Sequence, residues 1–540
     1  MRKSNWNVKV NGQGTPVNQI MNQLWASRGI DNFLSFIHPM GNILPSTALK
    51  NIVPAAELVK QHIDNHSKFL IYADVDVDGC SAAAILCHYL CNFDVEFDVY
   101  INNKKDHGVQ DYFFERSYGG ENIIIIVDSI NDTMREYEII MNSGVDLVVL
   151  DHHIPTQEIL DHQEEIHLVS SANDYANPHL SGSGVTWKFV NYLDELLGTA
   201  HAPGLMDLAA AGIIADVCSV GLDSMENREI CDHGMAYVNN VGMRAVIGAD
   251  EMNSESISFS IAPLVNAANR MNENKLALDL FLVDNTADAK KIVKELTKIK
   301  EKQKLLANEL FESFEEQAQD QLDKKCMFFF VDETCGTLGG LLATKASDKW
   351  NRPVIVVRET DKGYAGSMRA TGVDNFSKIV NDSGLGECMG HENSAGILIP
   401  FENMESLQAH IEASLVDMTV TTDQLIDLHI ERMQITPFLI GKIREFNRIS
   451  GAGFPALKVL IENVGKYTVK PMSQGKHLCI EVPDMKFLYW NFNKWDDVAE
   501  EGILSAVGSL DESFFAGRRT TQMIMQDYIF EALPTKTNLW

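Results

Sequence analysis

The segment FLIYADVDVDG, residues 69–79, decides the fold expected for this chain. Its first five residues carry no charge and are mostly apolar, which is typical of a strand buried on both faces of a parallel sheet. Three aspartates follow at alternate positions: Asp74, Asp76 and Asp78. In an extended segment alternate side chains point to the same face, so these like charges would crowd together unless a cation bound them.

Two further apolar runs end in polar side chains. NIIIIVDS, residues 122–129, ends with Asp128, and DLVVLDHH, residues 146–153, ends with Asp151, His152 and His153. In open α/β sheets ligands bind where the strands end, so we expect these side chains to converge in one crevice. Carboxylate oxygens with neutral imidazole select divalent ions such as Mn²⁺ or Mg²⁺. A lone aspartate after a strand is more often a helix N-cap or a turn residue, which is the alternative for Asp128.

Composition sets the outer limits. A chain of 540 residues with 45% hydrophobic content is expected to form several domains with cores of their own. No apolar stretch approaches the length of a membrane span, and the polar start lacks the apolar core of a signal peptide. The nine cysteines form no CxxC pair. We therefore expect reduced cysteines and a cytoplasmic protein.

The net charge is strongly negative, which argues against the basic surface that nucleic-acid-binding proteins usually have. The chain has 45 basic and 75 acidic residues, a net charge of −30, whereas phosphate contacts usually require a basic surface. Bound divalent ions would offset negative charge in the site itself. Basic residues also cluster locally at Lys104 and Lys105, in 290–304, and at Arg518 and Arg519. For 290–304 we favour a solvated helix face, because its lysines alternate with glutamates.

The order of the patterns predicts an α/β protein in five parts. Strand-like and helical segments alternate from about residue 51 to 220, which indicates a parallel sheet covered on both faces. Five short β-like runs after about residue 420 indicate a small barrel. The expected parts are a helical accessory segment (1–50), a parallel-sheet domain (51–285), a long connecting helix (286–325), a second α/β domain (326–418) and the barrel (419–540).

The acidic motifs carry a resemblance to a known family. DVDVDG, IVDS, LDHH and AAAGIIADV, the last containing Asp216, resemble in order the four motifs of the DHH phosphoesterase superfamily. Within that superfamily the chain resembles the RecJ family of single-strand-specific 5′ to 3′ exodeoxyribonucleases along nearly its whole length. The segments that carry this second resemblance are 24–39, 262–282, 338–357, 366–380, 388–396 and 503–529.

The resemblance implies a fold and an activity. The parts after residue 50 would be a DHH domain, a connecting helix, a DHH-associated domain and an OB fold. The enzyme would use two Mn²⁺ or Mg²⁺ ions to hydrolyse single-stranded DNA to 5′ mononucleotides in DNA repair and recombination. Asp76 and Asp128 would bind chiefly one ion, and Asp78, Asp128, His152 and Asp216 would bind the other. Asp74 and Asp151 would support the ligands, and His153 would act on the scissile phosphate or the leaving 3′ oxygen.

The resemblance also assigns substrate contacts. The residues for the nucleotide or its 5′ phosphate are Lys104, Arg270, Ser367, Arg369, Gly390 and His391. Lys104 stands where the family has an arginine, which keeps the charge but loses the bidentate fork. Met389 likewise stands where the family has glycine, and Ala370 where it has serine.

The predicted barrel offers aromatic side chains for stacking on bases. These are Tyr489, Trp490, Phe492 and Trp495, with Arg518 and Arg519 nearby in the sequence. The alternative is that alternate members of this cluster fill the barrel core.

Two other functions compete with the exonuclease. A DHH phosphodiesterase for short oligonucleotides or cyclic dinucleotides would normally lack the segment after residue 420. A non-catalytic replication or repair scaffold would normally have lost the acidic residues, which are all present here. The expected partners are single-stranded DNA, a helicase and a single-strand-binding protein, with no membrane association, and the chain is expected to be a monomer.

Overall fold

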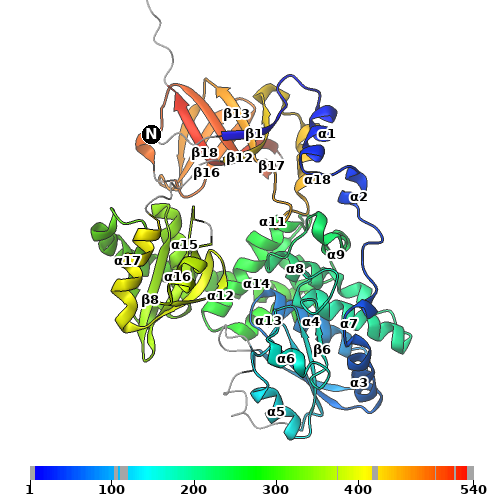
Figure 1. Ribbon diagram of the computed structural model, residues 1–540. Helices are drawn as coiled ribbons and strands as arrows, with labels where there is room; N and C mark the ends of the chain where they lie inside the picture. Colours follow the sequence, from blue (N-terminus) through cyan, green and yellow to red (C-terminus); the bar gives the residue numbers. More distant parts are fainter. Residues whose placement is uncertain are drawn as a thin grey trace, which may run out of the picture. The chain divides into compact units, whose positions relative to one another are not determined.

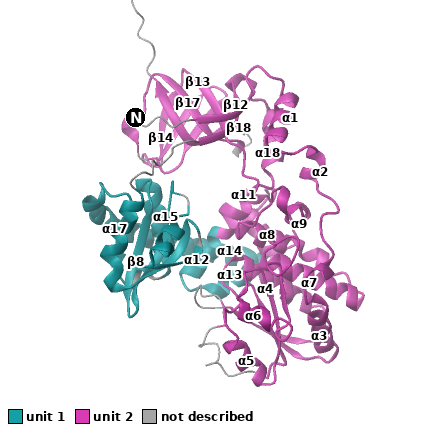
Figure 2. Ribbon diagram, in the orientation of Figure 1, with its two compact units in different colours: residues 1–4, 263–280, 287–422 teal, residues 5–262, 281–286, 423–540 magenta. Residues whose placement is uncertain are grey.

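The computed structural model describes residues 6–101, 108–109, 120–373, 375–415, 424–492, 494–515 and 518–531. The chain forms two compact units, which Figure 2 shows in different colours. Unit 1 comprises Met1–Ser4, Pro263–Leu280 and Ala287–Thr422, and unit 2 comprises Asn5–Ala262, Phe281–Thr286 and Asp423–Trp540. Within the described ranges, none of the helices is both long and apolar enough to cross a membrane.

A five-stranded parallel sheet forms where the apolar runs predicted it, in unit 2. Its strand order is β3-β2-β4-β5-β6. Figure 1 draws this sheet in blue and cyan, with β6 labelled. Every residue of β4 is buried, as expected for a strand covered on both faces. The register pairs Ala73 with Val127 and Val127 with Leu150, so β2, β4 and β5 end at nearly the same level. The strands are β2 (Lys68–Ala73), β3 (Glu96–Ile101), β4 (Ile123–Val127), β5 (Asp146–Asp151) and β6 (Leu168–Ser170).

Helices cover both faces of this sheet. On one face Tyr137 and Ile140 of α5 and Ile159 of α6 pack against alternate residues of β2, β4 and β5. The remaining strand residues face α3, α4 and α7, which contact β2, β4, β5 and β6. Helix α8 packs against α4, α7 and α9, and its apolar circumference suits such a buried position. The helices are α3 (Ile52–Asp64), α4 (Val77–Leu90), α5 (Arg135–Asn142), α6 (Gln157–Asp161), α7 (Gly182–Leu197), α8 (Met206–Ala215), α9 (Met225–Ala236) and α10 (Val241–Ile247).

Unit 1 contains the long helix and the second sheet. The long connecting helix expected at 286–325 is α14 (Thr286–Ala318), and Phe311 and Phe314 at its far end pack against β7 and α15. The sheet order is β10-β11-β9-β8-β7, with β7 and β8 parallel and the other pairs antiparallel. Its elements are β7 (Met327–Val331), α15 (Gly339–Trp350), β8 (Val354–Thr360), β9 (Gly363–Arg369), α16 (Phe376–Ser383), β10 (Glu387–His391), β11 (Ser394–Ile399) and α17 (Met404–Ser414), preceded by α12 (Ala262–Arg270) and α13 (Asn274–Leu282).

The C-terminal region forms an eight-stranded mixed sheet within unit 2. Its order is β1-β12-β13-β17-β18-β16-β15-β14, with β1 and β14 as edge strands. The five runs read from the sequence correspond to β13, β15, β16, β17 and β18. The strands are β1 (Trp6–Asn11), β12 (Gln424–Ile430), β13 (Val459–Val464), β14 (Thr468–Met472), β15 (His477–Val482), β16 (Met485–Tyr489), β17 (Ile503–Phe515) and β18 (Arg518–Glu531).

The start, which the sequence analysis expects to be helical, contains a strand as well as two helices. Strand β1 comes first and pairs in parallel with β12, more than 400 residues later, before α1 (Val17–Ser27) and α2 (Phe33–Ile37). Val10 is the only fully buried residue of β1, so its sequence shows little of the apolar pattern that marks a strand. Edge strand β14 was missed for the same reason, since it is mostly exposed and contains Pro471.

Candidate metal centre

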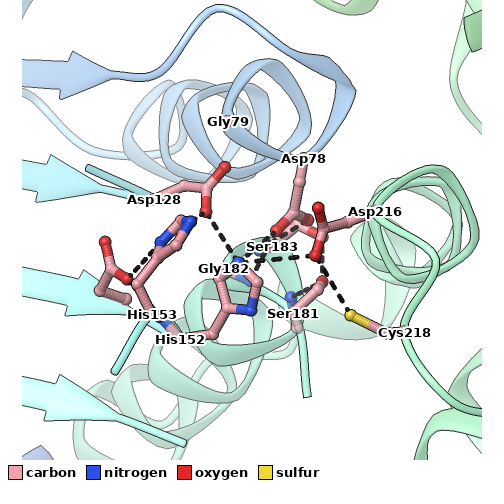
Figure 3. Close-up of polar contacts among 12 residues, drawn as sticks. Asp78, Gly79, Asp128, His152, His153, Ser181, Gly182, Ser183, Asp216 and Cys218 are labelled. Atoms are coloured by element: carbon pink, nitrogen blue, oxygen red, sulfur yellow. Dashed lines mark hydrogen bonds and ion pairs between the residues drawn. The ribbon is translucent and has the colours of Figure 1, made fainter. Parts of the chain in front are cut away.

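The carboxylates and imidazoles named from the sequence do converge at one end of the parallel sheet. Figure 3 shows Asp78, Asp128, His152 and Asp216 directed toward one another. They come from different elements: the first turn of α4, the end of β4, the end of β5 and the C-terminus of α8. The level ends of the strands bring the sheet residues together, and the packing of α8 against α4 brings Asp216 to them.

The three aspartates of DVDVDG do not lie in one extended segment, so that part of the interpretation was wrong. The strand ends at Ala73, and Asp76 is the N-cap of α4, with its Oδ1 accepting hydrogen bonds from the backbone N–H of Asp78 (3.0 Å) and Gly79 (3.2 Å). The free amides of the first helical turn favour such a cap over continued extension. A Cβ at Gly79 would lie 2.5 Å from the carbonyl oxygen of Asp74, so this helix start requires glycine.

Asp128 is not a helix cap. Its backbone lies in the left-handed region (φ 53°), which aspartate tolerates better than most residues, and its N–H donates to the carbonyl of Leu150 (3.0 Å). The side chain is 2% exposed, and its Oδ1 lies 3.2 Å from Nε2 of His152. The same imidazole nitrogen lies 3.6 Å from Asp216 Oδ2 and 3.8 Å from Asp78 Oδ2. One nitrogen therefore faces three carboxylates.

The N-terminus of α7 holds Asp78, a contact that the sequence analysis missed. The backbone N–H of Gly182 donates to Asp78 Oδ2 (2.7 Å), and that of Ser183 donates to Oδ1 (3.1 Å). A helix N-terminus favours a carboxylate through its free amides and its dipole. The signal in the sequence is SGSG, residues 181–184, where Ser181 caps the helix and small residues allow close approach.

Glycines pack closely against the carboxylates of Asp78 and Asp128. A Cβ at Gly182 would lie 2.8 Å from Asp128 Cβ and Oδ1, and a Cβ at Gly212 would lie 2.0 Å from Asp78 Oδ1. Neither position can hold a larger side chain without moving a carboxylate. Gly182 and Gly212 were not identified from the sequence as part of the site.

The donor set fits divalent cations. Three groups of side chains each have donor atoms within 4.8 Å of one another, and Asp128 and His152 each belong to two of these groups. They are Asp74, Asp76 and Asp128; Asp128, His152 and His153; and His152, Asp216 and Cys218. Cys218, whose Sγ lies 3.4 Å from Asp216 Oδ2, was missed from the sequence, although it follows Asp216 by only two residues.

The electrostatics also favour a bound cation. Burial, together with the charges of Asp78 and Asp76, raises the pKa of Asp128, and burial beside Asp78 raises the pKa of Asp216 to about 6. Burial lowers the pKa of His152, but the carboxylates around it outweigh this and raise it. Asp128 Oδ1 and His152 Nε2 are buried and make no hydrogen bond among the residues that the structure describes. A divalent cation would satisfy both atoms and offset the crowded charge.

Asp151 holds His153. Its Oδ1 lies 2.9 Å from His153 Nδ1 and accepts hydrogen bonds from the backbone N–H of His152 and His153, while Oδ2 accepts one from Ile130. Burial would raise the pKa of Asp151, but the charge of His153 lowers it to about 2. Burial would lower the pKa of His153, but Asp151 raises it to about 9. The His153 side chain is 35% exposed, so it extends from the centre toward solvent.

Unit 1 contains a second cluster from the predicted substrate residues. Burial lowers the pKa of Arg270 and the pKa of Arg369. The positive charge of Arg270 lowers the pKa of Arg369 further, so the two guanidinium groups repel each other. The hydroxyl of Ser367 and the guanidinium of Arg369 both border the start of α15, where a Cβ at Gly340 would lie 3.6 Å and 3.0 Å from them. A guanidinium beside a helix N-terminus, with a second cation close enough to act on it, forms an arrangement suited to an anion. The glycine pair 339–340 was not singled out from the sequence.

The other predicted substrate residues are less informative. Gly390 lies in β10 with φ 124°, and a Cβ added there would lie 3.2 Å from the Cα of Ala395. The pairing of β10 with β11 therefore favours glycine at this position. Lys104 and the side chain of His391 lie outside the described residues.

The four C-terminal aromatic residues have different surroundings. Phe492 is 5% exposed and packs edge-on against Tyr489 and Trp495, as the core-filling alternative describes. Trp495 donates its Nε1–H to the carbonyl of Gly475 (2.9 Å). Trp490 is 46% exposed and contacts His477 edge-on. Arg519 pairs with Glu512 (3.6 Å), and the side chain of Arg518 lies outside the described residues.

The chain is similar to several known proteins. Residues 68–213 match the model of the DHH family, N-terminal domain. The chain is 27% identical to the single-stranded-DNA-specific exonuclease RecJ of Bacillus subtilis, with 95% of this chain and 68% of that protein covered. It is 25% identical to RecJ of Thermus thermophilus, with 87% of this chain and 69% of that protein covered.

A solved structure has the same fold. The crystal structure of RecJ in complex with Mn²⁺ from Thermus thermophilus covers 99% of this chain, and 81% of its own chain is matched, with a TM-score of 0.77 at 23% identity. Residues 68–213 thus match the DHH family, N-terminal domain, and the chain is similar over nearly its whole length to RecJ single-stranded-DNA-specific exonucleases.

Proposed function

We propose that this protein is a metal-dependent exonuclease that degrades single-stranded DNA from the 5′ end to 5′ mononucleotides, in DNA repair or recombination. The observation that carries the proposal is the convergence of Asp78, Asp128, His152 and Asp216 on one point at the end of the parallel sheet. The similarity to RecJ proteins along 95% of the chain supports the choice of substrate.

Two Mn²⁺ or Mg²⁺ ions are the proposed cofactors. Asp76 and Asp128, with Asp74 beside them, would hold one ion. The four residues that converge, with Asp128 shared, would hold the other. When bound, the ions would lower the pKa of an attacking water and neutralise charge on the scissile phosphate. The amides of Gly182 and Ser183 would keep the Asp78 carboxylate oriented toward its ion.

His153 is the proposed proton donor to the leaving 3′ oxygen. Asp151 lies against Nδ1 of the ring and fixes its orientation, and it stabilises the protonated imidazole. The proton at Nε2 is then the one that can be transferred, because Nδ1 faces the carboxylate. Nearby cations would bring the pKa of His153 down from about 9 toward neutrality, where a general acid is most effective.

The cluster in unit 1 is the proposed site for the terminal phosphate of the strand. Arg270 and Arg369 would form forked bonds to its oxygens, and the amides at the start of α15 would add neutral donors. Ser367, Gly390, His391 and Lys104 remain proposed contacts to the same nucleotide. The C-terminal sheet is proposed to act as an OB-like domain that binds the strand, with Trp490 as its exposed stacking residue.

The remaining expectations stay proposals. The domain boundaries proposed from the sequence are 51–285 for the DHH domain, 286–325 for the connecting helix, 326–418 for the DHH-associated domain and 419–540 for the strand-binding domain. A helicase and a single-strand-binding protein are the proposed partners of a monomeric, cytoplasmic enzyme.

The test compares substrates and variants. The protein is incubated with Mn²⁺ and 5′-labelled single-stranded DNA, duplex DNA or RNA, alongside Asp128→Ala and His153→Ala. Asp94→Ala is the matched control, because that carboxylate is 98% exposed and lies outside the four motifs. We expect stepwise release of 5′ mononucleotides from single-stranded DNA alone, lost in the first two variants and retained in the control. Equal digestion of a circular strand would refute the exonuclease assignment.

The role of the C-terminal sheet is tested separately. Trp490→Ala is expected to weaken binding of a long single strand by about 1–3 kcal/mol, the usual value of one base stacked on an aromatic ring. Hydrolysis of a dinucleotide should not change, because it does not extend beyond the metal centre. Unchanged affinity for the long strand would remove Trp490 from the binding surface.

A further inference from the structure

The loop that follows metal-ligand candidate Asp216 has a strained backbone. Asp216 caps the C-terminus of α8, and the helix closes with hydrogen bonds from Cys218 N to Ile213 O (3.0 Å) and from Val217 N to Ile214 O (3.3 Å). This pattern places Val217 in the left-handed region (φ 58°), a position that usually holds glycine. A β-branched residue there is under strain, and such strain persists only where the surrounding structure holds it.

A segment of the C-terminal region holds this loop. We call residues 449–454 the clamp segment; it lies between α18 (Pro437–Asn447) and β13, in the same compact unit as Asp216. The backbone N–H of Val220 donates to the carbonyl of Ala452 (3.0 Å). A short bridge between Gly451 and Phe454 shapes the clamp segment itself. The loop that follows Asp216 is thus hydrogen-bonded directly to the C-terminal region, which is proposed to bind single-stranded DNA.

Arg228 ties the same parts together from α9. Its side chain is 1% exposed, and its Nη1 donates to the carbonyls of Val220 (3.0 Å) and Ile449 (3.1 Å). The guanidinium lies 4.8 Å from the ring centroid of Phe454 and 3.6 Å from that of Phe36, whose carbonyl accepts from Nε (2.6 Å). A planar guanidinium can make these bonds at once, whereas a lysine ammonium cannot present the same fork.

Gly453 makes the closest approach. It has φ 72°, and a Cβ there would lie 2.4 Å from Ser219 Oγ and 3.1 Å from Gly221 N. Ser219 is three residues after Asp216, and its hydroxyl donates to Asp223 Oδ1 (2.7 Å) while its carbonyl accepts from Asn227 (2.9 Å). The hydroxyl therefore cannot rotate away from a new methyl group without losing a bond, and the loop would have to move.

We propose that the clamp segment is a positioning element for Asp216, so that the C-terminal region contributes to the metal affinity of the catalytic centre in addition to any role in strand binding. Gly453 and Arg228 are the positioning residues. This inference rests on the proposed metal-dependent function. It implies that removing the C-terminal region would impair the metal centre even for substrates too short to reach that region.

The test uses two glycines with similar backbones. Gly453→Ala is compared with Gly475→Ala, because Gly475 also has a positive φ (84°) in the C-terminal region, but its Cβ would meet only Trp495 Nε1 at 4.0 Å. In both variants an alanine must adopt a positive φ, which is unfavourable. Only in Gly453→Ala does the new methyl group also clash with the 216–221 loop. The full-length proteins are compared by Mn²⁺ titration in a calorimeter and by the Mn²⁺ concentration that gives half-maximal dinucleotide hydrolysis.

We expect Gly453→Ala to weaken Mn²⁺ binding by about 10–100-fold, the usual effect of disturbing the groups that orient metal ligands. Saturating Mn²⁺ should restore much of its kcat, while Gly475→Ala should match the wild type in both measurements. Equal Mn²⁺ affinity in the two variants would overturn the inference. Failure of the wild type to bind Mn²⁺ would instead refute the proposed function, so the two failures are distinguishable.

A second variant guards against misfolding. Should Gly453→Ala fail to fold, as judged by thermal denaturation, Arg228→Lys keeps the buried charge but loses the fork to Val220 and Ile449. The same rise in the half-saturating Mn²⁺ concentration is expected. Arg228→Lys that folds and binds Mn²⁺ as the wild type does would refute the clamp. If Arg228→Lys binds single-stranded DNA as the wild type does but binds Mn²⁺ more weakly, the proposal is supported, because weaker DNA binding alone could not change metal binding.

Discussion

Gly212→Ala should disable the metal centre while leaving the protein folded. Gly212 lies within α8 and faces the carboxylate of Asp78. A Cβ there would lie 2.0 Å from Asp78 Oδ1 and 2.0 Å from Ser183 Oγ, whereas ordinary contact begins at 3.4 Å. The atoms must therefore separate by a further 1.4 Å. Asp78 has little freedom to yield, because backbone N–H groups of Gly182 and Ser183 hold both of its oxygens.

The expected magnitudes follow from opposing effects. Alanine in place of glycine within a helix stabilises by about 1 kcal/mol, and overpacking a buried site costs about 1–3 kcal/mol. The net loss of stability should thus be about 0–2 kcal/mol, small enough for the protein to remain folded. A misplacement of about 1 Å in a catalytic arrangement costs about 100-fold in rate, so activity should fall by at least that factor.

The assay measures Mn²⁺-dependent release of mononucleotides, Mn²⁺ affinity and the thermal midpoint together. Gly441→Ala is the matched control, because Gly441 also lies within a helix, α18, with no atom within 4 Å of its would-be Cβ. That control should gain about 1 kcal/mol of stability with full activity. If Gly212→Ala kept wild-type activity and Mn²⁺ affinity, the close packing of α8 against Asp78 would not matter for the centre, and the reasoning would fail.

Three further predictions concern single residues. Asp128→Asn keeps the size of the shared ligand but removes its charge. Mn²⁺ at 100 times the wild-type Kd should stabilise the wild type by about 2.7 kcal/mol but should no longer raise the thermal midpoint of the variant. A midpoint that Mn²⁺ still raises in the variant would contradict the assignment of Asp128 as a metal ligand. Lys188→Met leaves Glu226, its buried partner at 2.6 Å, without a counter-charge, and urea unfolding should show a loss of about 3–5 kcal/mol rather than an unchanged midpoint. Arg369→Ala should raise KM for 5′-phosphorylated strands more than for 5′-hydroxyl strands, and an equal rise in both would argue against a phosphate contact.

The parallel sheet and its acidic edge were predictable from the sequence because they depend on local patterns. The uninterrupted apolar runs of β2, β4 and β5 reflect burial on both faces, and the parallel arrangement places the ends of such strands side by side. Edge strands β1 and β14 were not predictable in this way, because few of their residues are buried. The conformation of DVDVDG was also misjudged, since its alternating pattern suits a strand while the carboxylate of Asp76 caps a helix.

The sequence by itself identified the carboxylates and imidazoles that converge in the candidate metal centre, because each of them lies in a short motif that can be read along the chain. Only the tertiary structure decided how those donors are held. The amides of α7 reach Asp78 across 104 positions of sequence, Gly212 leaves room for it from α8, and the clamp segment supports the Asp216 loop from the C-terminal region. Such contacts depend on packing between distant segments, which leaves no periodicity in the sequence of either partner, and so they become visible only when the chain is folded.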